Sequence, residues 1–303
     1  MSVVIVGTGQ GGFQAAASLR SDGYEGPVTL VGEEPHAPYQ RPPLSKAYLL
    51  GKQDAEGLLL RPLSFYAENR IDTLFGETVT AVDRTARRVT LASGGTLPYE
   101  RLVLATGARV KTLPVPGAEL DGIVYLRTRD DSDRLRDHLR HANRVVIIGG
   151  GYVGLEIAAA ARGFGKEVVV LEIEQRLMAR SAAPIMSDFY ADLHRDRGVD
   201  ILLGTGAAKI EGAGGRADAV LTSNGLRLPA DLVVVGIGVV PNVELAAACD
   251  LAIGNGIAVD EYLRTSDPSI YAIGDCCEFP SVHVGARVRL ESVQNAVDQA
   301  RAV

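Results

Sequence analysis

The 303-residue sequence predicts an α/β fold in which one order of elements occurs twice. Residues 3–18 and 145–161 each place a Val- and Ile-rich run before G-x-G-x-x-G and an alanine-rich run after it. Each copy continues with a second apolar run that ends in an acid, then three short strand patterns, then an apolar run that ends in glycine. Repetition of a whole series of elements indicates a duplicated domain rather than a duplicated motif.

The two glycine motifs have the order that a dinucleotide-binding βαβ unit requires. Their glycines are Gly7, Gly9 and Gly12 in the first copy and Gly149, Gly151 and Gly154 in the second. The first glycine permits a tight turn, the second lets the backbone approach a pyrophosphate, and the third lets the helix pack closely on the strand. The helix N-terminus then faces the phosphates with free N–H groups. Two glycine turns that bind nothing are the alternative, and two full motifs in one chain argue against it.

An acidic residue ends the second strand of each copy. Glu33 and Glu172 follow the third glycines by 21 and 18 residues. A carboxylate about 20 residues beyond such a motif commonly binds a ribose hydroxyl. We therefore expect these two acids to bind one ribose each, although the neighbouring Glu34 leaves open which acid acts in the first copy.

Composition and charge limit the class of protein. The chain is 47% hydrophobic, and its net charge of −6 disfavours nucleic acid and anionic membranes as partners. A run of about 20 apolar residues and a signal peptide are both absent from the sequence, so we expect a cytoplasmic protein without a membrane segment. Cys249, Cys276 and Cys277 form no C-x-x-C, and no cluster has metal-ligand spacing. We therefore expect reduced thiols and no metal site.

The second domain is predicted to be inserted in the first. Residues 79–100 and 207–230 each read as three short strands, and IYAIGD, which ends at Asp275, reads as a further buried strand. We expect that strand to return to the first sheet. Boundaries beside TLPVPG and VVPN then give a first domain of residues 1–109 and 242–303 and a second of residues 110–241.

This arrangement resembles the two-dinucleotide-binding-domain flavoproteins. The motifs that carry the resemblance are GTGQGG, LATGA, GGGYVGLE, GIGVVPN and YAIGDC. The resemblance covers the whole chain and implies two Rossmann-like domains, with FAD in the first and NAD in the second. Family members that reduce disulfides, peroxides or coenzyme A disulfide keep an early redox cysteine, whereas this sequence has no cysteine before Cys249.

YQRPPLSKAYL and RLESVQNA are similar to ferredoxin reductases of the putidaredoxin reductase type. That resemblance implies hydride transfer from NADH to FAD, and then single electrons to a two-iron two-sulfur ferredoxin that serves a haem monooxygenase. Reductases that serve ring-hydroxylating dioxygenases are also similar, but some carry Trp where this chain has Val293. A rubredoxin or nitrite reductase flavin subunit, and a non-enzymatic NADH-sensing flavoprotein similar to apoptosis-inducing factor, remain the alternatives.

The resemblance also assigns site residues. It implies FAD contacts for Gly7, Gly9, Gly11, Gly12, Glu33, Arg41, Lys46, Val79, Thr106, Gly107, Arg127, Asp275 and Val293, and NAD contacts for Gly149, Gly151, Gly154, Glu172 and Arg180. Gly11 is an extra glycine, and a small turn residue is an equal alternative for it. Without the resemblance, Val79 reads as core and Arg127 as surface. Ser292 is predicted to cap a helix whose N-terminus faces the flavin.

Lys46 and Glu156 are the predicted catalytic pair. In the family these positions pair near flavin N5, where the hydride arrives, and Arg41 is expected nearby. Arg136 and Arg140 lie four apart on one predicted helix face. That face is either solvated or attractive to an acidic ferredoxin.

Family members usually continue for about a hundred residues as a third domain, an ordinary domain size. This sequence stops at QARAV inside a helical pattern, so we expect a truncated chain.

Overall fold

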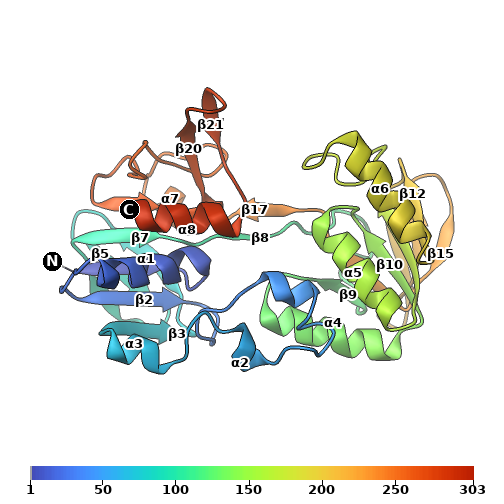
Figure 1. Ribbon diagram of the computed structural model, residues 1–303, viewed down its shortest axis with the longest axis horizontal. Helices are drawn as coiled ribbons and strands as arrows, with labels where there is room; N and C mark the ends of the chain where they lie inside the picture. Colours follow the sequence, from blue (N-terminus) through green and yellow to red (C-terminus); the bar gives the residue numbers. More distant parts are fainter. Residues whose placement is uncertain (1) are drawn as a thin grey trace. The chain divides into compact units, whose positions relative to one another are not determined.

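The structure, a computed structural model, describes residues 2–303 and contains two compact units (Figure 1). Unit 1 comprises the chain up to Gln40, Leu59–Arg109 and Val240–Val303. Unit 2 comprises Arg41–Leu58 and Val110–Val239.

Unit 1 is built on a parallel sheet of five strands in the order β19-β7-β1-β2-β3. The strands are β1 (Val3–Val6), β2 (Val28–Gly32), β3 (Ile71–Phe75), β7 (Arg101–Leu104) and β19 (Ile270–Ala272). All four residues of β1 are buried, because neighbouring elements cover both faces of the sheet. The strand of IYAIGD pairs with β7, which confirms the predicted return of the chain to the first sheet.

The helices of unit 1 bring the two ends of the chain together. Figure 1 shows α1 (Gln10–Ser21) and α8 (Val293–Ala302) side by side, and the two helices are in contact. The smaller helices are α3 (Ser64–Glu68), α7 (Glu244–Ala248) and the 3₁₀ turn η2 (Gly274–Cys276). The chain therefore closes unit 1 with a segment that follows the whole of unit 2 in sequence.

Two small antiparallel or mixed sheets complete unit 1. The predicted meander is β4 (Val79–Asp83), β5 (Arg88–Leu91) and β6 (Thr96–Pro98). A second sheet contains β18 (Ile257–Ala258), β20 (Cys277–Ser281) and β21 (Ala286–Val288). The meander was predicted from the sequence, whereas the β20–β21 hairpin was not.

Unit 2 repeats the strand order of unit 1, with the order β12-β11-β10-β16-β9 and parallel pairing throughout. Its strands are β9 (Ile123–Tyr125), β10 (Arg144–Ile148), β11 (Glu167–Glu172), β12 (Val199–Leu203) and β16 (Leu232–Val235). The fifth strand of unit 2, β9, precedes the glycine motif in the chain, whereas the fifth strand of unit 1, β19, follows the other four strands of its sheet and the whole of unit 2. The duplication therefore holds for four strands, and each unit recruits its fifth from a different place.

Unit 2 also contains the second predicted meander and the remaining helices. The meander is β13 (Ala207–Ala213), β14 (Arg216–Thr222) and β15 (Arg227–Pro229), and the helices are α2 (Ala55–Leu58), α4 (Arg129–His141), α5 (Tyr152–Gly163), α6 (Pro184–Arg195) and the 3₁₀ turn η1 (Pro42–Ser45). Where the chain passes between the units, β8 (Ala108–Val110) and β17 (Val239–Pro241) pair as a two-stranded sheet.

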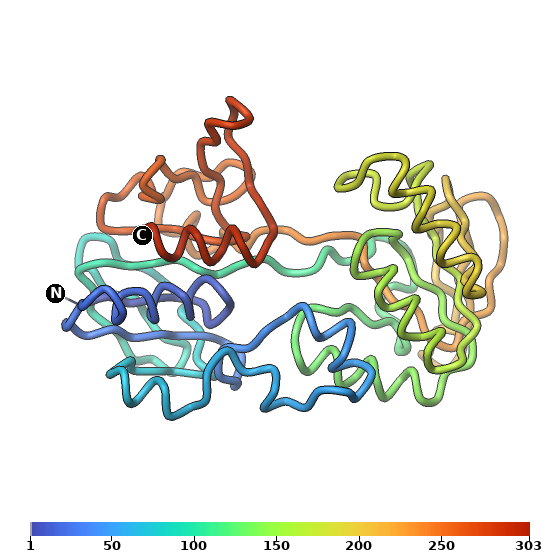
Figure 2. Tube along the Cα trace, viewed as in Figure 1, coloured from blue at the N-terminus to red at the C-terminus, as the bar shows by residue number. Residues whose placement is uncertain are grey.

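One segment is grouped differently from the sequence-based boundaries. Arg41–Leu58 precedes much of unit 1 in the chain but packs as part of unit 2. Figure 2 shows the blue trace of this segment beside the green trace of α4. Leu49 is fully buried in the core of unit 2, which explains why the segment belongs there.

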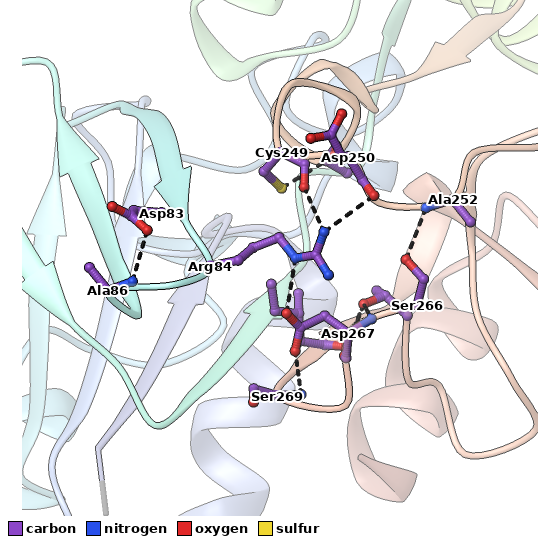
Figure 3. A network of polar contacts seen from close by, with 12 residues as sticks. Asp83, Arg84, Ala86, Cys249, Asp250, Ala252, Ser266, Asp267 and Ser269 are labelled. Atoms are coloured by element: carbon purple, nitrogen blue, oxygen red, sulfur yellow. Dashed lines mark hydrogen bonds and ion pairs between the residues drawn. The ribbon is translucent and has the colours of Figure 1, made fainter.

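Arg84 ties the meander of unit 1 to the returning chain (Figure 3). Its Nε donates to Asp267 at 3.0 Å, and its Nη1 donates to the carbonyl oxygens of Cys249 at 3.2 Å and Asp250 at 3.4 Å. Burial raises the pKa of Asp267, but hydrogen bonds from the Ser269 N–H and from Arg84 outweigh burial, so this pKa is lowered. The ionised form of Asp267 is therefore the form that stabilises unit 1.

No helix among residues 2–303 combines the length and the apolar character that crossing a bilayer requires. Within the same residues, no group of three or more His, Cys, Asp or Glu side chains could hold a metal ion.

We expect Arg84→Met to lower the thermal unfolding midpoint at pH 7, because Asp267 and two carbonyl groups lose their donor. A group whose pKa is lowered by folding contributes stability above its unfolded pKa and loses that contribution as pH falls through its folded pKa. The difference from the parent should therefore be largest at neutral pH and shrink below about pH 4. Arg88→Met, at an exposed position of the same meander, is the control. Equal midpoints for both variants at pH 7 would contradict this role of Arg84.

Candidate functional site

The first glycine of each motif lies against the backbone of a neighbouring strand end. A Cβ atom on Gly7 would lie 2.1 Å from the carbonyl oxygen of Ala105, and one on Gly149 would lie 2.4 Å from that of Gly236. Both glycines have positive φ, +117° and +113°. Any side chain at these positions would therefore meet both a backbone clash and an unfavourable conformation.

The third glycine of each motif brings the helix onto the strand. A Cβ atom on Gly12 would lie 1.8 Å from the oxygen of Gly7, and one on Gly154 would lie 2.0 Å from the oxygen of Gly149. The predicted reason for this glycine, close packing of the helix at the turn, is thus visible in the geometry of both units.

The second glycine of each motif is open on its side-chain face. Gly9 and Gly151 are the N-caps of α1 and α5, and no atom lies within 4 Å of a Cβ built on either. Neither helix has a side-chain cap or an acid in its first turn, whereas Thr128 and Asp131 form a capping box on α4. The first N–H groups of α1 and α5 are thus left for an anionic ligand, and each cradle fits a dinucleotide pyrophosphate.

Gly11 has a different environment from the other motif glycines. It is buried, and a Cβ atom there would lie 3.5 Å from Ile273 Cδ1 and 3.8 Å from Ala296 Cβ. Its side-chain face therefore points into the contact between α1 and α8 rather than toward the open cradle. This packing supports the alternative of a small turn residue, and the closer approach of Gly11 to the pyrophosphate stays a prediction.

The acids of the two copies do not occupy equivalent positions. Gly7 N donates to Val31 O at 2.7 Å, and Gly149 N donates to Leu171 O at 2.8 Å, so Gly32 is the counterpart of Glu172. A Cβ atom on Gly32 would lie 2.2 Å from Thr8 Oγ1. In unit 1 the Thr8 side chain fills the space that the acid occupies in unit 2.

Glu172 is fixed at the edge of its motif. Its Oε2 accepts from Gly150 N at 2.7 Å, and its Oε1 accepts from Glu174 N at 2.8 Å. Glu33 lies one residue beyond the equivalent position and is exposed, while Glu34 accepts a short hydrogen bond from Tyr39 Oη. The ribose contact of Glu172 is thus supported by its geometry, and that of Glu33 stays a prediction.

The two arginines after Glu172 differ in their freedom. Arg176 donates to Ala179 O and Ala182 O, both at 2.7 Å, and to Ser187 Oγ at 2.9 Å. Its guanidinium is thus used within its own loop. Arg180 is exposed, and its Nη1 lies 3.6 Å from a Cβ built on Gly238 of the GIGVVPN motif. Arg180 is therefore the cation of the pair that a ligand can reach.

Lys46 and Glu156 form an ion pair within unit 2. Lys46 Nζ lies 2.8 Å from Glu156 Oε2, with the two side chains 50% and 29% exposed. The buried Ser45 hydroxyl donates to the same oxygen at 2.5 Å, a contact that the sequence did not predict. Arg41 Nη1 donates to the Arg127 carbonyl oxygen at 2.6 Å, so these two predicted residues also lie together.

The segment that carries Lys46 is held by α4. Ser132 Oγ donates to Leu44 O at 2.7 Å, and Tyr48 Oη donates to Asp133 at 3.1 Å. Arg136 donates to Tyr48 O at 3.1 Å and lies over the Tyr48 ring at 5.1 Å. Burial raises the pKa of Tyr48, and its bond to Asp133 raises it further, so the phenol stays protonated.

The exposed face of α4 is not a basic patch. Arg134, Arg136 and Arg140 each pair with an aspartate three residues earlier. Arg136 is also used to hold Tyr48. The idea that Arg136 and Arg140 attract an acidic ferredoxin is therefore not supported by the charge on this face.

Asn242, the last residue of GIGVVPN, bonds to the LATGA loop within unit 1. Thr106 Oγ1 donates to Asn242 O at 2.7 Å, and Asn242 Nδ2 donates to Thr106 O at 2.8 Å. Asn242 N also donates to Gly107 O at 2.9 Å. The asparagine of GIGVVPN thus fixes the LATGA loop, a role that the sequence did not predict.

The remaining predicted FAD contacts lie at the ends of their elements or in the core of unit 1. Val79 is 8% exposed, and its side chain packs in the core of unit 1. A contact of Val79 with FAD would therefore be made by its backbone. Asp275 lies in η2, directly after β19. Ser292 caps α8 by accepting from Asn295 N at 3.1 Å, as predicted, and Val293 begins the helix.

All three cysteines are buried. Cys276 Sγ donates to Ile273 O at 3.2 Å, and Cys277 Sγ donates to Gln299 Oε1 at 3.3 Å. Burial raises the pKa of all three thiols. A raised pKa and burial both suppress the thiolate, so these groups are packed donors rather than redox groups.

These features define a flavoprotein with two dinucleotide-binding units. The family model for pyridine nucleotide-disulphide oxidoreductase matches residues 1–300, and the chain belongs to that family. It is therefore an oxidoreductase that binds FAD and a nicotinamide dinucleotide.

Several relatives are ferredoxin reductases. Rhodocoxin reductase of Rhodococcus erythropolis is 52% identical over 99% of this chain and 70% of its own length. The ferredoxin reductase for the CYP199A2 system of Rhodopseudomonas palustris has a TM-score of 0.97 at 48% identity, over 99% of this chain and 74% of that one. Putidaredoxin reductase in its covalent complex with putidaredoxin has a TM-score of 0.96 at 47% identity, over 99% and 73%.

Replacement of Cys276 and Cys277 by Ser together should leave the rate of NADH-dependent reduction of ferricyanide within a few-fold of the parent. Serine keeps a donor for Ile273 and Gln299, and neither thiol is accessible as a nucleophile. The measurement is a steady-state rate at matched FAD content. A loss above about 100-fold with FAD still bound would assign a thiol to the reaction.

Proposed function

We propose that this chain is an NADH:ferredoxin oxidoreductase. The observation that carries the proposal is the combination of two open dinucleotide cradles with thiols that are all buried in residues 2–303. A flavoprotein whose thiols are all buried and unpaired would not relay electrons through its own cysteines, so the electrons would pass from the flavin directly to the acceptor. Relatives that are ferredoxin reductases support this acceptor class.

FAD, when bound, takes an electron pair as hydride from NADH and releases electrons singly. The cradle at Gly9 and the N-terminus of α1 would hold the FAD pyrophosphate, with Asp275 and the N-terminus of α8 toward the rest of the cofactor. The cradle at Gly151, with Glu172, would hold NADH. The Lys46–Glu156 pair would orient the reacting groups, and no general acid or base is required.

The partner is proposed as a two-iron two-sulfur ferredoxin that supplies a haem monooxygenase, with a rubredoxin as the alternative acceptor. A steady-state assay of NADH oxidation with purified candidates of each kind tests this. A kcat/KM for a ferredoxin at least 10-fold above that for rubredoxin supports the proposal, and the reverse ratio contradicts it. A persistent reduced complex with NAD, and no turnover with either, would favour an NADH-sensing role. The cytoplasmic location stays a prediction from the sequence.

NADH should be preferred to NADPH. The carboxylate of Glu172, fixed by two backbone N–H groups, would accept from the ribose 2′-OH and repel a 2′-phosphate. Glu172→Gln should lower the ratio of kcat/KM for NADH over NADPH by roughly 10-fold, mostly through KM. Glu174→Gln is the neighbouring control. Equal efficiency of the parent with both cofactors would overturn the assignment.

Lys46→Met should slow flavin reduction at saturating NADH by roughly 10- to 1000-fold, the loss expected for one preorganised charge near a reacting atom. Glu156→Gln should be milder, because the amide oxygen still accepts from Ser45 or Lys46. Stopped-flow loss of flavin absorbance isolates this step from partner binding. Lys52→Met, on the same segment and exposed, is the control.

FAD should remain bound in Lys46→Met, because the pyrophosphate cradle lies in unit 1. Reduction of Lys46→Met at the parent rate would show that the lysine only anchors its own segment.

A further inference from the structure

Three parts of unit 1 converge around Ala296 in the first turn of α8. Its Cβ lies 3.8 Å from a Cβ built on Gly11 and 3.6 Å from one built on Gly274. The first turn of α1, the start of η2 and the first turn of α8 therefore meet at one point. The place of Asp275 relative to the phosphate cradle depends on how firmly this point is held.

The backbone of Gly274 and Asp275 is held on both sides by side chains from residues 289–299. The Gly274 N–H donates to Gln299 Oε1 at 2.7 Å. On the other side, Arg289 Nη1 donates to the carbonyl oxygen of Asp275 at 3.1 Å. The N–H of Gly274 is thus held by Gln299, which lies within α8, and the carbonyl of the next residue, Asp275, is held by Arg289, which precedes α8.

Arg289 is placed for this contact by its own surroundings. Its side chain is 8% exposed, and its Nη2 lies 2.7 Å from Glu291 Oε1. Gly256 has a φ of +147°, and a Cβ atom built on it would lie 3.1 Å from Arg289 Cδ and 2.9 Å from Cys276 O. Position 256 can carry no side chain, because the arginine stem and the Cys276 carbonyl fill that space.

Both side chains are costly to bury. Arg289 Nε and Gln299 Nε2 are buried and have no hydrogen-bond partner among residues 2–303. A buried polar atom without a partner destabilises the folded state, so an apolar residue would be the cheaper choice on stability alone. Residues that break a packing rule in this way are typical of functional positions.

We propose that Arg289 and Gln299 are positioning residues that hold Asp275 and the N-terminus of α8 in place, and thereby set the affinity for FAD and its midpoint potential. The proposal rests on the proposed contacts of Asp275 and α8 with FAD. The buried guanidinium and the helix N-terminus both favour negative charge on the reduced cofactor.

The test compares Arg289→Met, Arg289→Lys and Gln299→Met with two matched controls. Arg287→Met removes an arginine that also bonds a glutamate and two carbonyls, but touches Val259 and Glu278 instead of residue 275. Gln294→Met removes an exposed glutamine of α8 that bonds Asp298. For each protein, three quantities are measured: the FAD dissociation constant from titration of apoprotein, the midpoint potential, and the unfolding midpoint of the apoprotein.

Arg289→Met and Gln299→Met should raise the FAD dissociation constant by roughly 10-fold or more, the scale of one buried hydrogen bond. Their midpoint potentials should move to more negative values than those of the controls. Arg289→Lys should give an FAD dissociation constant and a midpoint potential between those of the parent and Arg289→Met, because lysine keeps the charge but lacks the several N–H donors of the guanidinium. If Arg289→Met does not fold, Arg289→Lys and Gln299→Met decide the outcome.

Parent-like FAD affinity and potential in Arg289→Met and Gln299→Met, even with a lowered unfolding midpoint, would overturn the proposal, because it would leave these residues a stability role alone. Asp275→Asn tests the proposed contact of Asp275 with FAD separately from the roles of Arg289 and Gln299. Unchanged FAD affinity in Asp275→Asn would remove the proposed contact of Asp275 with FAD, while the Arg289 and Gln299 variants still decide whether this clamp acts on the cofactor.

Discussion

The structure depends on one backbone contact that occurs in each unit: the first motif glycine against the carbonyl of the residue after a neighbouring strand. Gly7 approaches Ala105, and Gly149 approaches Gly236. This approach ends the first strand, turns the chain into the helix, and fixes the helix N-terminus beside the next loop. The open face of Gly9 or Gly151 is then a consequence, because the two flanking glycines have already determined the path of the loop.

The same contact explains why motifs far apart in sequence belong together. Ala105 begins the loop that Asn242 fixes through Thr106 and Gly107, and Gly236 begins GIGVVPN, in which Gly238 lies beneath Arg180. Four of the five motifs that carried the family resemblance are thus the two sides of the two cradles, GTGQGG with LATGA and GGGYVGLE with GIGVVPN. A substitution in LATGA should affect the glycine motif directly, because the backbones of Ala105 and Gly7 already lie as close together as their atoms allow.

The sequence predicted the elements well and the side-chain partners less well. Apolar runs and glycine spacing predicted β1, β2, β7 and the return of β19 in unit 1, β10, β11 and β16 in unit 2, and both meanders, because these depend on local pattern and on which runs are buried. The strands β3, β9 and β12 were not predicted. Equating Glu33 with Glu172 failed because the strand position equivalent to Glu172 is occupied by Gly32, and the acid of unit 1 comes one residue later. The roles of Ser45, Asn242, Arg289 and Gln299 needed contacts between residues distant in the chain, which spacing cannot show.

The segment Arg41–Leu58 shows how grouping by packing differs from grouping by sequence order. A polar clamp of Ser132, Asp133 and Arg136 and the buried Leu49 attach it to unit 2, and it carries Lys46 to Glu156. The ion pair is therefore assembled inside one unit and does not depend on how the other unit is placed. Arg41 and Arg127 are joined in the same way. A charged pair whose two members belong to one unit is held in place by that unit alone, which is the arrangement that preorganised electrostatics requires.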